Sequence, residues 1–226
     1  MQSFFVLLQL TNSSVPLGAY NYSDGLEFLV ESELITSAEG IQDWLTTELK
    51  HGSIRMDIAV MLKVNQAIIA NENSELNYWN SWLNGTRETS ELRQQSMQMG
   101  NSLLKLLGDL DPEKRVQIQA LRESIGKNCH FAVAFGVAIA LWEIDTRQAV
   151  WAYLHSWASN LVSAAVKLVP LGQTQGQQII YELHPIIDAV ATELLDPKEE
   201  HFYACSWGLG LASMNHETQY TRLFRS

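Results

Sequence analysis

Helical periodicity is the feature that most constrains this chain. Apolar residues recur every three to four positions along most of the sequence, while the strict alternation typical of β-strands is nearly absent. Turn and cap signals separate the periodic stretches, as where Thr36 and Glu39 form a capping-box pattern before an apolar series. The pattern favours an all-α fold.

Proline residues and capping residues indicate where the helices are expected to begin and end. Asp-Pro pairs at 111–112 and 196–197 favour helix starts, and Pro170 ends a long apolar series. The expected helices span about residues 36–52, 54–69, 76–83, 86–107, 128–143, 146–169 and 175–194, with two more after the Asp-Pro pairs. No repeat, low-complexity stretch or linker divides this series. We therefore expect one domain over residues 1–226, a single compact bundle of about ten helices with a polar C-terminal tail at 216–226.

One of these helices is rich in small side chains. Residues 131–142 include Ala132, Ala134 and Gly136. Small side chains let helix backbones approach closely, so we expect this helix near the centre of the bundle.

The net charge and the lengths of the apolar runs indicate which partners and which cellular location to expect. The 226 residues carry 25 Asp and Glu against 15 Lys and Arg, a formal charge of −10, and no basic block offers a phosphate-binding surface. The longest uncharged apolar run, residues 131–142, is well short of the roughly 20 residues a spanning helix needs. The N-terminal run lacks the basic region and cleavage site of a signal peptide. We expect no nucleic-acid partner, no membrane partner and a cytoplasmic location.

Known catalytic motifs are incomplete in this sequence. His216-Glu217 begins like a zinc-protease motif, but Tyr220 stands where the second histidine belongs. The sequence also has no P-loop lysine, no complete dinucleotide-binding glycine pattern and no G-x-S-x-G nucleophile motif. We therefore expect no catalytic residue and no bound cofactor.

The sequence offers only weak candidates for a metal ion. His201 and Cys205 are four residues apart, so on one helix they would share a face and could hold a soft or borderline ion. His216 is a third weak candidate. Two ligands alone bind weakly, and a structural role for these residues is the alternative.

Four polar segments are more specific than solubility requires. They cover residues 10–31, 86–100, 160–177 and 216–226. In the first, Ser23 or Asp24 is placed to cap a helix, with Glu27 in the first turn, where the helix dipole favours a carboxylate.

Read together, these segments resemble the family of the urease accessory protein UreF, a nickel-centre assembly factor of ureolytic bacteria. Residues 16–27 match the family's P-x-G-x-[FY]-x-[YWS]-S-x-G-L-E, and residues 87–92 match R-E-T-x-E-L. Residues 167–173 match K-L-V-P-L-G-Q, and residues 216–226 match the closing H-E-T-Q-Y-T-R-L-F-R-S. The four matches occur in order and reach the last residue, which makes the resemblance strong.

The resemblance implies an all-α, non-catalytic protein that forms a homodimer. It implies an adaptor that joins the accessory protein UreD, also called UreH, and the GTPase UreG on the way to apo-urease. GTP hydrolysis in that complex is coupled to nickel insertion into the urease active site. The candidate partner contacts are the polar and aromatic members of the four matches and their neighbours: Tyr22, Ser23, Glu27, Arg87, Glu88, Lys167, Gln173, Gln177, His216, Glu217, Tyr220, Arg222, Phe224 and Arg225.

Several alternatives stay open at this level. The tail at 216–226 is either mobile until UreD docks or folded back on its own domain or dimer mate. Capping competes with partner contact for Ser23 and Glu27, and snorkelling to the surface competes with it for Lys167. A second function is modulation of the UreG GTPase, with Arg87, Arg222 or Arg225 acting in trans. Direct nickel carriage and an unrecognised hydrolase activity are weaker readings.

Overall fold

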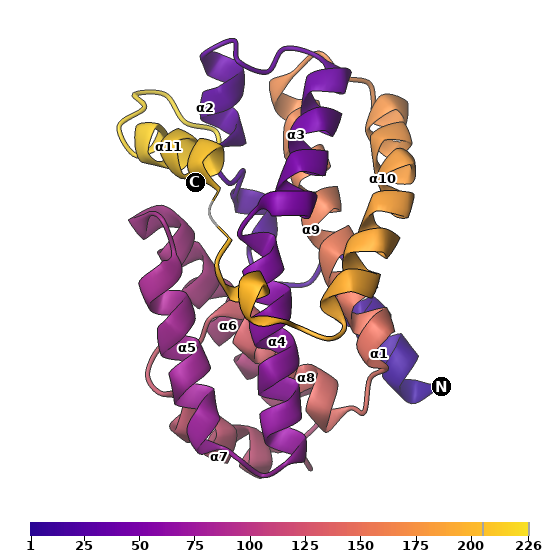
Figure 1. Cartoon of the computed structure of the whole chain (residues 1–226), viewed down its shortest axis with the longest axis vertical. Coiled ribbons are helices and arrows are strands. Elements are labelled where there is room, and N and C mark those ends of the chain that lie inside the picture. Colours follow the sequence, from indigo (N-terminus) through magenta and orange to yellow (C-terminus); the bar gives the residue numbers. More distant parts are fainter. Residues whose placement is uncertain (205, 226) are drawn as a thin grey trace.

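The computed structural model describes residues 1–204 and 206–225, and within those ranges it is built from helices and turns without a β-strand (Figure 1). The described residues form eleven α-helices and two short 3-10 helices. In chain order they are α1 (Gln2–Leu10), η1 (Ala19–Asn21), α2 (Leu26–Glu31), α3 (Ala38–His51), α4 (Ile54–Ile69), α5 (Ser74–Thr86), α6 (Ser90–Leu110), α7 (Arg115–Ile125), α8 (Phe131–Leu141), α9 (Thr146–Leu168), α10 (Gln173–Leu194), η2 (Glu199–Phe202) and α11 (Trp207–His216). The all-α prediction is confirmed.

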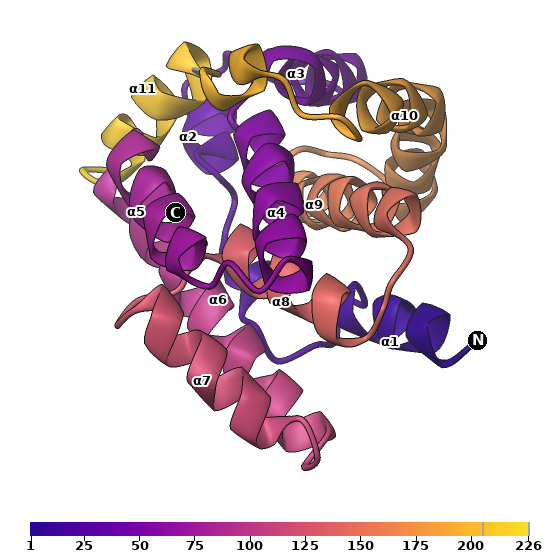
Figure 2. The same ribbon diagram turned by 60° about the horizontal axis from the view of Figure 1, so that its bottom comes forward.

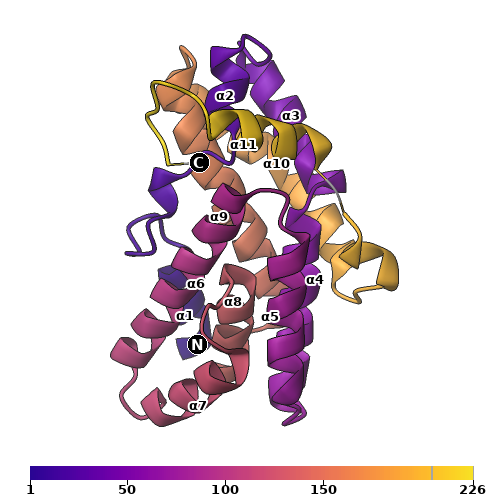
Figure 3. The same cartoon turned by 90° about the vertical axis from the view of Figure 1, so that its left-hand side faces the viewer.

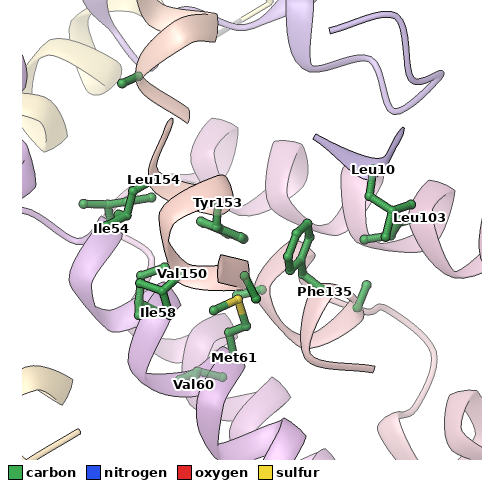
Figure 4. Close-up of a cluster of buried hydrophobic side chains, with 14 of the residues drawn as sticks. Leu10, Ile54, Ile58, Val60, Met61, Leu103, Phe135, Val150, Tyr153 and Leu154 are labelled. Atoms are coloured by element: carbon green, nitrogen blue, oxygen red, sulfur yellow. The ribbon is translucent and has the colours of Figure 1, made fainter. Parts of the chain in front are cut away.

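The core lies where α4, α8 and α9 meet. Figure 4 shows Met61 of α4, Phe135 of α8 and Tyr153 of α9 turned toward one another, and all three are buried. Gly136 explains how closely α8 approaches α4, because a Cβ at that position would lie 2.7 Å from the Met61 carbonyl oxygen. The small residues of 131–142 therefore do place this helix at the centre of the bundle.

Two groups of helices surround this core. The helix pair α9 and α10 packs with α3 on one side. Helix α5 packs against α4, and α6 packs against α8, all below α11 in Figure 3. Figure 2 shows α7 at the edge away from α3 and α10. In Figure 1, α11 lies beside α2 at the upper end, so the C-terminal segment returns to the first polar segment of the chain.

Some helix boundaries differ from the expected ones. The capping residue of α3 is Ser37 rather than Thr36, since Ser37 has the extended backbone of an N-cap and its Oγ accepts from Gly40 N at 3.2 Å. Helix α6 begins at Ser90, because the Thr89 side chain caps it and accepts from Leu92 N. After Asp111-Pro112 a turn precedes the helix, so α7 starts only at Arg115. After Asp196-Pro197 the short 3-10 helix η2 forms, instead of the expected α-helix.

A membrane-spanning helix must be both long and apolar. In the described part of the chain, none of the helices is both long and apolar enough to cross a membrane.

Candidate functional site

A buried histidine ties the C-terminal helix to two distant parts of the chain. His216, the last residue of α11, is fully buried. Its Nδ1 lies 2.9 Å from Glu91 Oε2, and its Nε2 lies 3.1 Å from Glu27 Oε2. Each ring nitrogen of His216 therefore lies within hydrogen-bond distance of a carboxylate, and at least one of the two donates. Because Glu27 and Glu91 lie in the first turns of α2 and α6, His216 connects three of the four polar segments.

Glu27 also holds the tail. Its carboxylate accepts from the backbone N–H groups of Leu223 and Phe224, the latter at 2.9 Å. Nearby, Arg222 Nη1 donates to Glu91 Oε1 at 3.0 Å, and Arg225 N donates to the Asn21 carbonyl at 2.8 Å. A buried carboxylate needs donors, and here the tail backbone supplies them. Residues 222–225 are therefore folded back on their own domain, and the mobile-tail alternative does not describe this structure.

The remaining polar segment, residues 160–177, joins through Lys167. Phe224 is buried, and Lys167 Nζ lies 5.3 Å from the centroid of its ring, within the range of a cation–π contact. Lys167 itself is exposed at the C-terminal end of α9. All four polar segments thus meet at one place, which we call the C-terminal junction: Glu27, Glu91, Lys167, His216 and Phe224.

Apolar side chains point outward beside this junction. Trp207, Leu211 and Met214 follow one another at helical spacing on α11 and are 76%, 57% and 52% exposed. We call these three residues the α11 face. In the tail, Tyr220 and Leu223 are also exposed, although the backbone around Leu223 is clamped by Glu27. Large apolar and aromatic side chains held outward in this way are typical of a protein-binding surface.

Comparison with known proteins decides the family. Residues 35–184 match the family model described as UreF. The chain belongs to the UreF family. Curated members named urease accessory protein UreF include those of Picosynechococcus sp., 64% identical over 221 residues and 98% of each chain, and of Trichormus variabilis, 52% identical over 223 residues, 99% of this chain and 96% of that one. A more distant one, from Alkalilimnicola ehrlichii, is 38% identical over 97% of this chain and 94% of its own.

In this UreF-family chain the candidate residues divide into two sets. The inward set consists of Tyr22, Ser23, Glu27, His216 and Phe224, all buried, together with the Arg87 side chain. The outward set consists of Lys167, Gln173, Gln177, Glu217, Tyr220, Arg222 and Arg225, while Glu88 is partly buried. The side chains of the inward set are therefore held within this chain's own fold, while those of the outward set reach the surface.

Arg87 lies in the interior rather than at the surface. Its guanidinium pairs with Asp57 through Nη2 and Oδ1, at 2.5 Å, and both side chains are 9% exposed. Burial disfavours the charged form, but the Asp57 carboxylate outweighs it and raises the pKa of Arg87. Tyr153 Oη lies 3.4 Å from the other Asp57 oxygen. An arginine held in this way is a structural cation of the core.

A cavity of about 640 Å³ adjoins this ion pair. Its lining includes Asp24, Asp57 and Arg87 from the interior and Lys167 and Gln177 from the exposed ends of α9 and α10. Burial raises the pKa of Asp24, although Gln95 and Trp157 donate hydrogen bonds to its carboxylate at 2.7 and 3.3 Å. The inner end of the cavity is thus acidic apart from Arg87.

Sequence reasoning missed two acidic residues of this interior. Asp57 carries the Arg87 pair, and Glu48 of α3 is buried beside Ser206. A signal for Asp57 was present, since a charged residue interrupts the apolar series of α4 at a core position. No such signal marks Glu48, whose surroundings come from a residue far along the chain.

Glu48 is the clearest source of pH dependence. Burial raises its pKa to about 7, the carboxylates of Glu88 and Asp24 act in the same direction, and the hydrogen bond from Ser206 opposes them. The folded state therefore binds this proton more tightly than the unfolded state. The stability that Glu48 contributes is complete below about pH 4.5 and is lost as the pH rises through about 7.

We expect Glu48→Gln to stabilise the protein by about 1–3 kcal/mol at pH 8, because glutamine keeps the Ser206 contact without a buried charge. The gain should shrink as the pH falls to about 5, where wild-type Glu48 is largely protonated in the folded protein. Urea unfolding at both pH values measures the difference, with the exposed Glu72→Gln as control. A gain that is equal at both pH values would contradict the assignment.

The metal candidates are not arranged as expected. His201 lies in η2, a 3-10 helix that ends at Phe202, rather than in an α-helix. Its Nδ1 accepts from Lys198 N at 3.1 Å, and its Nε2 lies 3.3 Å from Glu193 Oε1. Cys205 lies outside the described residues. Within the described ranges, no group of three or more His, Cys, Asp or Glu side chains is arranged to hold a metal ion.

Proposed function

We propose that this chain acts in urease maturation as a non-catalytic adaptor that joins UreD (UreH) to the GTPase UreG. In this proposal GTP hydrolysis by UreG is coupled to nickel insertion into apo-urease, and the chain works in the cytoplasm as a homodimer. The family and the names of its curated relatives support an accessory role in urease maturation. The exposed surface beside the C-terminal junction supports an adaptor.

The α11 face is the observation that carries the proposal. Trp207, Leu211 and Met214 expose their side chains although α11 itself is anchored by the buried His216. A rigid backbone that presents a tryptophan loses little conformational entropy on binding, and central tryptophans are frequent hot spots of interfaces. We assign UreD to the α11 face and to the exposed Tyr220 and Leu223 of the tail.

The positions of the arginine side chains bear on the alternative function, modulation of the UreG GTPase. Arg87 is buried against Asp57, so an arginine acting in trans on UreG would be Arg222 or Arg225. Arg222 already pairs with Glu91 through a side chain that is 39% exposed. GTP turnover by UreG with and without this chain and UreD separates the alternative from the adaptor, which requires no change in turnover. Direct nickel carriage would need ligands beyond His201 and His216.

We expect Trp207→Ala and Leu211→Asp each to weaken co-purification of UreD by at least about tenfold, because each removes apolar contact area from the centre of the docking surface. Both side chains are exposed, so the fold should be unaffected. The measurement is the amount of UreD retained by the tagged chain, compared with the retained UreG.

A matched control lies at the opposite end of the molecule. Val116 of α7 is 82% exposed, and α7 lies at the end of the molecule away from α11 (Figure 1), so Val116→Asp should leave UreD binding unchanged. Point variants are preferable to deletion of residues 216–226, since deletion would also remove the buried His216 and Phe224. If both α11 variants retain UreD as the wild type does, the docking assignment is wrong.

A further inference from the structure

Two histidines face each other across the α9–α10 hairpin. His155 lies midway along α9 and His184 midway along α10, and a short connection joins the two helices. Their ring centroids are 5.6 Å apart and their planes are inclined by 35°. Both residues are exposed, and both line the cavity described above. Neither takes part in the C-terminal junction.

The spacing of the rings suits a shared ion. Two imidazole nitrogens bound at about 2.0–2.1 Å to one metal ion place their ring centroids roughly 5 Å apart. The 5.6 Å between the His155 and His184 centroids is close to this value, so small side-chain rotations suffice to bring both rings to one ion. Neutral imidazole is a ligand that copper, nickel and zinc ions accept readily.

Neighbouring side chains restrict both rings. His155 Nδ1 lies 3.4 Å from Ser159 Oγ, which leaves Nε2 as the nitrogen for a ligand. The ring of Tyr181 packs edge-on against His184, with centroids 5.5 Å apart. Partners that fix the orientation of a histidine ring are a regular feature of metal sites.

A proline interrupts the backbone hydrogen bonds of α10 beside His184. Pro185 lies inside the helix and has no N–H, so the Tyr181 carbonyl lacks the donor that a helix normally supplies from that position. His184 side-chain atoms lean toward this N-terminal turn, where Tyr181 lies. Asp188, one turn further along, is engaged by Trp151 Nε1 at 3.0 Å and is not needed as a ligand.

We propose that His155 and His184 form a binding site for one divalent transition-metal ion of borderline softness, such as Ni²⁺, Cu²⁺ or Zn²⁺. Water completes the coordination. With two imidazole ligands the site is weak and exchangeable rather than a permanent structural centre. It differs from the candidates His201, Cys205 and His216, which lie elsewhere in the chain.

Metal titration of the isolated, untagged full chain tests the site. Isothermal titration calorimetry with NiCl₂ should show one saturable site per chain near neutral pH. His155→Gln and His184→Gln should each weaken this affinity by at least about tenfold, a loss comparable to that seen when even an outer-shell partner is removed. The exposed His51→Gln on α3 serves as the matched control and should bind as the wild type does.

A spectroscopic readout locates the ion independently of affinity. Paramagnetic Ni²⁺ should broaden the ring-proton resonances of His155 and His184 before those of the other histidines. No saturable binding to the wild type, or binding that both glutamine variants retain at wild-type strength, would overturn the proposal. Because no partner protein enters this experiment, its failure is distinguishable from failure of the adaptor function.

Discussion

Glu27→Ala is expected to lower the free energy of unfolding by about 3–5 kcal/mol, because several buried groups lose their hydrogen-bond acceptor at a cost of about 1–3 kcal/mol each. The change would leave His216 without one carboxylate and the N–H groups of Leu223 and Phe224 without their acceptor. Unsatisfied buried donors lose their hydration without compensation, so the tail should detach from α2. Phe224 would then leave its buried position beside Lys167.

Two measurements check this expectation. Urea unfolding gives the change in stability, and hydrogen exchange of the Leu223 and Phe224 amides reports release of the tail. Glu217→Ala is the control, because Glu217 is exposed and its carboxylate accepts a hydrogen bond from the exposed Ser90 hydroxyl at 3.2 Å. Unchanged amide protection in Glu27→Ala would show that the carboxylate does not hold the tail.

Asp57→Ala is expected to destabilise the protein by a similar amount, about 3–5 kcal/mol, because it leaves the buried Arg87 guanidinium without its counter-ion. Asp57 also faces Tyr153 in the core, so the polar group of that tyrosine would lose its neighbour. Urea or thermal unfolding measures the effect.

The double variant Asp57→Leu with Arg87→Met identifies the cause. Replacing a buried ion pair by apolar residues is often neutral, so the double variant should be more stable than Asp57→Ala. If both variants are equally unstable, lost packing rather than the unpaired charge explains the result.

The helices could be predicted because their signals are local. The expected helix at 146–169 corresponds to α9, and the one at 175–194 corresponds to α10. Apolar spacing, caps and glycine or proline breaks act within a few residues, so a single sequence shows them. Boundaries were less accurate where two residues could cap the same helix, as at Thr36 and Ser37.

The candidate site was predicted only in part. The four segments were identified, and they meet in the structure at the C-terminal junction. Which of their side chains face inward could not be predicted, and Arg87 and Phe224 prove to be buried. The tail has too few apolar residues for a helical stripe, yet one phenylalanine and two clamped amides are enough to hold it.

By itself, the sequence determined the helical fold and the UreF-family motifs, because both are written in short stretches of residues. Only the tertiary structure decided that His216 lies between Glu27 and Glu91 and that the tail is fastened to α2. Glu27 and His216 are separated by 189 positions in the chain, and each becomes a partner of the other only when α11 packs against α2. The same holds for the hairpin that brings His155 to His184, since burial and pairing of polar groups depend on how helices pack and not on the helices themselves.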